Sequence, residues 1–149
     1  MQFEVNQMAE RMHNTMNLNQ VYDWVELSKI FECKEDYFLV AGGMISRPDQ
    51  GVVVVITHPE GGKSFDYGDK WEGDELIYTG KGQTGDQRFA GENRLVAENA
   101  ATIMVFEHHA PRQLKYLGIA VCRKWEWSIG LDKNNQSRKE LKFRLKINP

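Results

Sequence analysis

The segment from Asp66 to Gln83 has the residue types best suited to chemistry. It contains three aromatic rings, several carboxylates and four glycines within eighteen residues. A hydrophobic core does not require this mixture. A pocket for a flat ligand does, because such a ligand needs ring faces to stack on and a carboxylate that accepts hydrogen bonds from its N–H groups. A nucleobase that has left its base stack is a ligand of this kind.

Five residues of this segment are candidates for the pocket. Tyr67, Trp71 and Tyr78 could stack on a planar ligand, and each stacking contact is worth ~1–3 kcal/mol. Asp69 could accept a hydrogen bond from an exocyclic amine, as carboxylates do from N4 of cytosine, and Thr79 offers a hydroxyl. A structural interpretation competes with this one: Trp71 and Tyr78 would belong to the core, and Asp69 would cap a turn.

A second set of polar residues stands in or beside loops that contain glycine. Glycine lets backbone N–H groups approach phosphate oxygens, and lysine or arginine adds positive charge. The candidates for contact with a nucleic-acid backbone or groove are Arg47, Lys63, Lys81, Gln83, Arg88 and Arg94. Scattered surface cations are the alternative interpretation of this set.

The composition indicates one folded domain. The chain has 149 residues, of which 41% are hydrophobic and 27% are charged, as in ordinary globular proteins. Two distant cysteines give no disulfide framework, and no apolar run reaches the length of a membrane span. We therefore expect a cytoplasmic, reducing location.

The charge is distributed unevenly along the chain. Residues 112–149 contain ten Lys/Arg and three Asp/Glu, a net charge of +7. The remainder contains nine Lys/Arg and eighteen Asp/Glu, a net charge of −9. This asymmetry is compatible with a basic face on an acidic body, or with a basic strand on a solvated surface.

The sequence argues against metal-dependent or hydrolytic catalysis. His108 and His109 are adjacent, so in extended chain their side chains point in opposite directions. No Cys-x-x-Cys, P-loop, dinucleotide or nucleophile-elbow motif is present. Cys122 fits a small buried residue better than a nucleophile. We expect a binding protein without metal or cofactor.

Hydrophobic patterning predicts a mainly β fold of the α+β class. Six or seven strands and two helices are expected, and evenly spaced strands joined by turns favour a barrel. Residues 1–18 are expected to form an arm or a short helix before a domain that spans residues 19–149. The expected helices are 20–32, with Asn19 as its N-cap, and 92–101; the clearest expected strands are 36–40, 52–56, 102–107, 114–121, 122–130 and 141–147.

Several short motifs in a fixed order resemble one known family. They are Ala41-Gly42-Gly43-Met44-Ile45-Ser46-Arg47-Pro48, Tyr67-Gly68-Asp69-Lys70-Trp71-Glu72-Gly73-Asp74, Tyr78-Thr79-Gly80-Lys81-Gly82-Gln83, Gly91-x-Asn93-Arg94 and Tyr116-Leu117-Gly118. Together they resemble the SRA (SET- and RING-associated, or YDG) domain. The resemblance is strongest to the SRA-like domains of bacterial McrA-type restriction endonucleases, and it covers roughly residues 20–147.

The resemblance implies a PUA-like β-barrel with two or three flanking helices. It also implies a reader that flips a modified cytosine out of double-stranded DNA, with 5-methylcytosine and 5-hydroxymethylcytosine as the leading choices. In the family an Asp nine residues before the Tyr of Tyr-Thr-Gly holds the polar edge of the base, and that Asp corresponds to Asp69. Tyr78 corresponds to one stacking ring and Thr79 to the pocket threonine. The second ring falls to Tyr67, Phe65 or Trp71, because the family's Tyr-Glu-Asp-Asp run is missing.

Family members of the McrA type usually continue into an HNH nuclease, and this chain has no such motif after residue 147. We therefore expect the chain itself to bind DNA without cutting it, as the recognition module of a modification-dependent restriction system. A fused or separate HNH nuclease and a second copy of the chain are compatible partners. A PUA-like RNA-binding module is the alternative function, since an aromatic clamp also suits RNA bases.

Overall fold

The computed structural model describes residues 2–34, 43–59 and 68–148 of the chain. The helices are α1 (Gln2–Thr15), α2 (Trp24–Ile30) and α4 (Gly91–Ala97), with a short 3-10 helix η1 (Pro48–Gln50). The strands are β1 (Val21–Asp23), β2 (Met44–Arg47), β3 (Val52–Thr57), β4 (Lys70–Glu72), β5 (Glu75–Thr79), β6 (Thr102–Ala110), β7 (Gln113–Leu131) and β8 (Ser137–Asn148). The expected strand at 36–40 lies outside the described residues.

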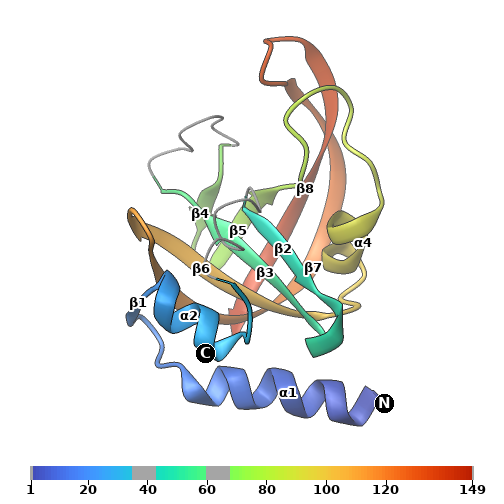
Figure 1. The fold of residues 1–149 in the computed structure, drawn as a ribbon. Coiled ribbons are helices and arrows are strands. Elements are labelled where there is room, and N and C mark those ends of the chain that lie inside the picture. Colours follow the sequence, from blue (N-terminus) through green and yellow to red (C-terminus); the bar gives the residue numbers. More distant parts are fainter. Residues whose placement is uncertain (1, 35–42, 60–67, 149) are drawn as a thin grey trace.

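All eight strands belong to one sheet with the order β2-β3-β6-β7-β8-β5-β4, and β1 pairs with the start of β7. Neighbouring strands are antiparallel except for β3 and β6, which are parallel. The mainly β, α+β fold is therefore confirmed. Within the described residues β2 and β4 do not pair, so the sheet does not close into the expected barrel. Figure 1 shows α1 lying across one end of the curved sheet and β7 with β8 projecting from the other end.

The apolar run from Val52 to Ile56 in strand β3 is buried on both faces, which explains its lack of alternation. Val52, Val54 and Ile56 pack into a core cluster that the sheet shares with α1 and α2. Val53 and Val55 point the other way, into a cluster shared with β5, β8 and α4. Helices α1 and α2 thus cover one face of β3, and β5, β8 and α4 cover the other.

The N-terminal region differs from the expectation. Residues 2–15 form helix α1, but the next helix begins at Trp24 rather than at residue 20. Asp23 is its N-cap, because the Asp23 carboxylate accepts from the Glu26 amide at 2.8 Å and the Glu26 side chain accepts from the Asp23 amide at 3.2 Å. Asn19 is not an N-cap: it has a φ of 66° and its amide donates to the Tyr116 carbonyl.

The two strands expected at 114–121 and 122–130 are one continuous strand, β7, with a register shift between Cys122 and Lys124. The strand expected at 102–107 continues to Ala110, so only two residues separate β6 from β7. A bulge lets a strand bend without ending, so a single β7 can pair with β6 at its start and with β8 at its end.

Two buried amides fix the loop that follows β5. The Gln87 side chain donates to the carbonyls of Gly80 and Gly82 at 2.6 and 3.1 Å and accepts from the Leu141 amide at 2.9 Å. The Asn93 side chain accepts from the Lys81 amide at 2.7 Å. A Cβ on Gly80 would lie 2.8 Å from Oε1 of Gln87 and 2.9 Å from Oδ1 of Asn93, so only glycine fits there.

We predict that Gln87→Ala lowers the free energy of unfolding by ~1–3 kcal/mol, because the Leu141 N–H and the Gly80 carbonyl lose their buried partner. Urea denaturation followed by circular dichroism measures the change. Gln136→Ala, which truncates an exposed side chain in the hairpin turn, is the matched control. A loss for Gln87→Ala no larger than that of the control would contradict this role of the amide.

Candidate functional site

Asp69 lies where the ends of three strands meet. One carboxylate oxygen accepts a hydrogen bond from Oγ1 of Thr57, the last residue of β3, at 3.0 Å. The other oxygen accepts from the backbone amide of Thr79, the last residue of β5, at 3.3 Å. Asp69 itself directly precedes β4. Donors on two different strands therefore set the orientation of this carboxylate.

Tyr78 is buried beside this carboxylate, with 6% of its surface exposed. Its hydroxyl lies 2.8 Å from the carbonyl oxygen of Gly43 and 3.0 Å from that of Ile56. The ring belongs to the core cluster formed with β8. Tyr78 thus anchors β5 to the backbone of two other segments, and its role as a stacking ring stays a prediction.

Trp71 and Thr79 lie on opposite faces of the β4–β5 ribbon. Trp71 pairs with Leu76 and is 40% exposed, on the same face as Tyr78. The Thr79 side chain is buried on the other face, where its hydroxyl accepts from Nζ of Lys142 at 2.5 Å. Thr79 therefore contacts Asp69 through its backbone amide. Tyr67 and Phe65 lie outside the described residues, so the structure does not test the choice of the second ring.

The predicted contacts to a nucleic-acid backbone have different environments. Arg47 is mostly buried and donates to the Phe31 carbonyl at 3.0 Å and to Gln50 at 3.2 Å. Arg88 is exposed near the start of α4, and Arg94 is exposed and paired with Glu98 in the same helix.

The two predicted contacts of the loop after β5 are also held by other parts of the chain. The ammonium of Lys81 lies 3.3 Å from both the Met44 carbonyl and Glu92, and the Gln83 carbonyl accepts from the Lys133 amide. Lys63 lies outside the described residues.

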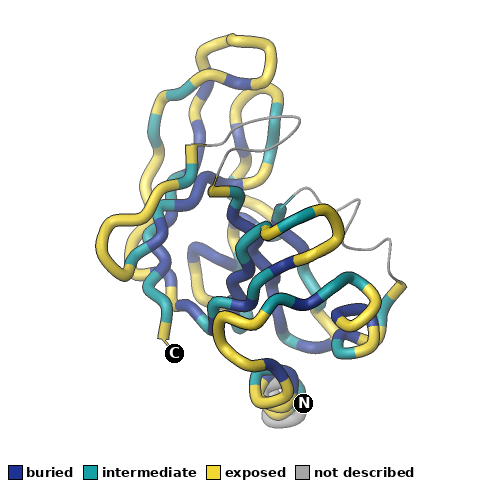
Figure 2. Tube along the Cα trace, turned by 90° about the vertical axis from the view of Figure 1, so that its left-hand side faces the viewer, coloured by how far each residue is buried: buried dark blue, intermediate teal, exposed yellow. Residues whose placement is uncertain are grey.

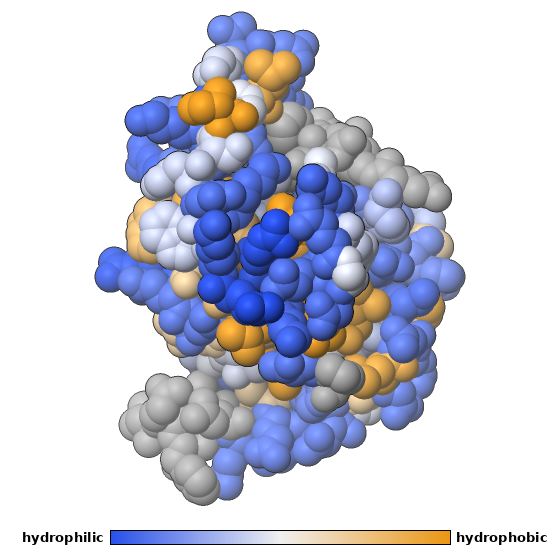
Figure 3. Space-filling view, turned by 180° about the vertical axis from the view of Figure 1, so that it is seen from behind, coloured by the Kyte–Doolittle hydropathy of each residue, from blue (hydrophilic) through white to orange (hydrophobic). Residues whose placement is uncertain are grey.

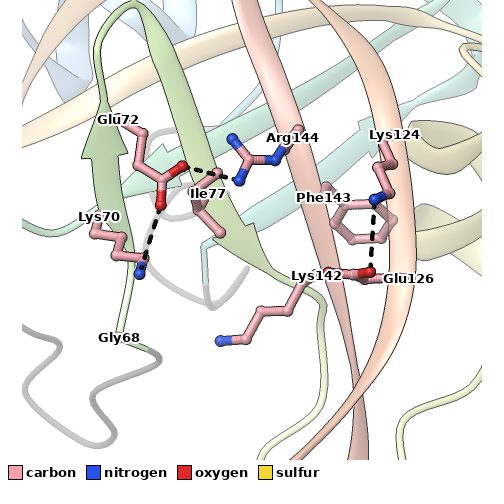
Figure 4. Close-up of a pocket in the computed structure, with 9 residues that line it drawn as sticks. All are labelled: Gly68, Lys70, Glu72, Ile77, Lys124, Glu126, Lys142, Phe143 and Arg144. Atoms are coloured by element: carbon pink, nitrogen blue, oxygen red, sulfur yellow. Dashed lines mark ion pairs between the residues drawn. The ribbon is translucent and has the colours of Figure 1, made fainter.

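A cleft of ≈ 350 Å³ lies on the polar face of the sheet, between the β4–β5 ribbon and strands β7 and β8. In Figure 4, Arg144 points toward Glu72 across the cleft, and Lys124 pairs with Glu126 on the adjacent strand. The cleft is lined by Gly68, Lys70, Glu72, Ile77, Lys124, Glu126, Lys142, Phe143 and Arg144. Because acids pair with its bases, this cleft is a mixed-charge surface next to Thr79.

The basic face suggested by the charge asymmetry does not form along β8. Arg144 lies 2.8 Å from Glu72 and 3.2 Å from Glu75, and Arg123 lies 3.0 Å from Glu75. The hydrogen bond and charge of Arg144 lower the pKa of Glu72 below its usual value. The basic C-terminal strand and the acidic β4–β5 ribbon therefore neutralise each other, because the sheet places them side by side.

Three groups that suggested chemistry are explained by burial or by pairing. The rings of His58 and His108 stack with centroids 5.0 Å apart, and burial, with a smaller effect of His108, lowers the pKa of His58. Cys122 is buried, as expected for a small core residue, and this burial raises the pKa of its thiol to about 11. Across the described ranges, no three His, Cys, Asp or Glu residues cluster closely enough to hold a metal ion.

Sequence reasoning missed two residues of this site. Thr57 is the first hydroxyl after the apolar run of β3, and a polar residue at the end of a buried strand is a signal that could have identified it. Lys142 stands on the polar face of the alternating strand β8, two positions from Glu140, with which it pairs at 3.3 Å.

The described helices include none long and apolar enough to cross a membrane.

Comparisons with solved structures place this arrangement in a known fold. The type IV phosphorothioation-dependent restriction endonuclease ScoMcrA superposes with a TM-score of 0.66 at 20% identity, over 90% of this chain and 28% of that one. The sulfur-binding and SRA domains of ScoMcrA complexed with phosphorothioated DNA give 0.66 at 18% identity, over 90% and 40%. The SUVH5 SRA domain in complex with hemimethylated CG DNA gives 0.63 at 17% identity, over 90% of both chains.

The sequence comparisons are more specific. No curated protein matches the chain. None of the three similar structures named above is described as an RNA complex, so they give no support to the RNA-binding alternative. The family model described as "ScoMcrA-like, SRA domain" matches residues 39–149, which is most of the chain and includes Asp69 and the whole sheet from β2 to β8. The chain therefore belongs to the ScoMcrA-like SRA domain family.

Proposed function

We propose that this chain reads a modified cytosine in double-stranded DNA by base flipping, as the recognition module of a modification-dependent restriction system. The observation that carries the proposal is the Asp69 carboxylate, oriented by the Thr57 hydroxyl and the Thr79 amide at the meeting point of β3, β4 and β5. A fixed carboxylate is the acceptor that N4 of an everted cytosine needs. The solved SRA relatives in complex with phosphorothioated or hemimethylated DNA support DNA as the ligand.

The energetics of flipping are compatible with this site. Removing a cytosine from the duplex costs a few kcal/mol. Stacking on an aromatic ring returns ~1–3 kcal/mol, and a hydrogen bond to a charged carboxylate returns ~1.5–3 kcal/mol. One methyl group in an apolar pocket adds only ~1–3 kcal/mol, so discrimination between plain and methylated cytosine is modest.

The test of the function is fluorescence anisotropy with one duplex in five forms. The target cytosine is plain, 5-methylated, 5-hydroxymethylated or glucosylated, and the fifth duplex carries a phosphorothioate next to plain cytosine. The proposal expects the tightest binding to a duplex with a modified base. Equal binding to all base-modified forms and to plain cytosine would contradict it, and preference for the phosphorothioate alone would move the recognised group from the base to the backbone. Tighter binding to single-stranded RNA in competition would also contradict it.

We predict that Asp69→Ala weakens binding to the 5-methylcytosine duplex ~10–100-fold, because the amine of the flipped base loses a charged acceptor. Asp74→Ala is the matched control, since this exposed carboxylate lies nearby in the β4–β5 turn and makes a single long ion pair with Lys146 at 4.0 Å. Its affinity should stay within about twofold of the wild-type value. Equal losses for the two variants would remove the pocket assignment of Asp69.

We also predict that two arginine substitutions affect different properties, DNA affinity in one case and stability in the other. Arg88→Ala should weaken binding to plain and modified duplexes by the same factor and reduce the salt slope by about 0.9, because an exposed cation contacts phosphate without reading a base. Arg47→Ala should mainly lower the melting temperature, since it loses its hydrogen bonds to Phe31 and Gln50. Salt titrations and thermal melts measure both effects. A change of base preference in Arg88→Ala would contradict its role as a backbone contact.

A further inference from the structure

Among the described strands, the outer part of β7 has a partner along one of its two edges only. Pairing with β6 ends at Ala120, and the side-chain amide of Asn99 then bonds the N–H and C=O of Cys122 at 2.8 and 2.9 Å. From Arg123 to Leu131, β7 pairs only with β8 among the described strands. We call this stretch the outer edge of β7.

The opposite side of the same hairpin is already covered. The loop after β5 runs along β8, where the Gly80 amide donates to Leu141, the Gln87 amide donates to Lys139, and the Lys139 amide donates to Asp86. Asp132 in the turn accepts from the Gly85 amide at 2.9 Å and further fixes the tip. Within the described part of the chain, the outer edge of β7 is therefore the side of this hairpin left without a strand or loop paired to it, and Figure 2 shows exposed residues along the projecting hairpin.

The outer edge carries exposed apolar side chains on one face. Trp127 is 44% exposed, Ile129 is 70% exposed and Leu131 is 58% exposed, while Trp125 is partly covered by Phe89 at 4.7 Å. Figure 3 shows hydrophobic surface on the projecting end of the molecule, surrounded by polar side chains. Soluble proteins protect such edges with proline, inward charges or bulges, and the register shift of β7 lies only at its base. An edge of this kind is suited to pairing with another strand.

We propose that the outer edge of β7 pairs antiparallel with the same edge of a second copy of this chain, around a two-fold axis at Trp127. A two-fold axis makes the paired strands antiparallel automatically. This register places Trp127 opposite Trp127 and Trp125 opposite Ile129 of the other copy, so all exposed apolar side chains share one face.

The charges fit the same register. Lys124 falls opposite Gly130 of the second copy and Glu126 falls opposite Ser128, so no two like charges face each other. A register centred on Glu126 would instead place two carboxylates opposite each other, which is destabilising. A register centred between two residues would place the tryptophans of one copy on the same face as Lys124 and Glu126 of the other copy. The Trp127 register also uses the full length of the edge from Arg123 to Leu131.

Cysteine cross-linking tests this register. In the proposed dimer, the two residues at position 127 lie directly opposite, within the Cα distance of about 4.4–6.8 Å that a disulfide spans. Trp127→Cys should therefore form a covalent dimer under mild oxidation, whereas Ile129→Cys should not, because its counterpart lies four residues away along the partner strand. The wild-type chain, with Cys33 and Cys122, gives the background. Equal cross-linking of the two variants would overturn the register.

The oligomeric state tests the surface itself. Light scattering should find the wild-type chain dimeric at high concentration and the double variant Trp127→Lys/Ile129→Lys monomeric, with at least a 100-fold weaker association. Val25→Lys, which changes an exposed apolar residue on α2, is the control and should leave the dimer intact. Circular dichroism confirms that each variant is folded.

Two results would overturn the proposal. One is a wild-type chain that stays monomeric up to about 0.5 mM. The other is a double variant that remains dimeric by light scattering but loses affinity for DNA, because that result would mean that the outer edge of β7 contacts nucleic acid and not a second copy. Loss of the dimer with unchanged preference for modified DNA separates this inference from the proposed function.

Discussion

The hydrogen bonds of the Asp69 carboxylate are the interaction on which the site depends. They connect the last residue of β3 and the last residue of β5 to the residue that directly precedes β4. β3 lies in the core and β5 pairs with β8, so the carboxylate is held by two strands that the sheet itself fixes. A charged acceptor fixed in this way needs little reorganisation when a base arrives, which is the condition for selective recognition.

Hydrogen bonds and close packing in the loop after β5 hold the surroundings of Asp69 in place. Gln87 and Asn93 satisfy its backbone groups, and Gly80 leaves no space for a side chain. The Tyr78 hydroxyl ties the same strand to Gly43 and Ile56. The residues of the Tyr-Thr-Gly motif therefore pack and hydrogen-bond the end of β5, and the same residues are the proposed contacts to the ligand.

The sequence predicted the parts of the fold that follow from local patterns. The apolar run of β3, the alternation of β8 and the helical composition of α4 each identified the element. Asp69 and Thr79 were predicted by the family resemblance, and the structure brings them into contact.

The features that the sequence did not predict depend on pairing between distant segments. Thr57 reaches Asp69 because β3 and β4 meet in space. The cations of β8 face the acids of β4 and β5 because the sheet pairs them, and the β1 pairing with β7 displaced the start of α2. Non-local contacts of this kind leave no periodic signal in the sequence.

The most direct measurement of the central claim compares two duplexes that differ only at the edge of the target base. One carries 5-methylcytosine opposite guanine, and the other carries thymine opposite guanine, which has the same methyl group but a carbonyl in place of the amine. The mismatched thymine is the easier base to flip. If Asp69 accepts from the amine, the methylcytosine duplex binds at least ~10-fold more tightly despite its higher flipping cost. Equal or tighter binding of the thymine duplex would contradict the account.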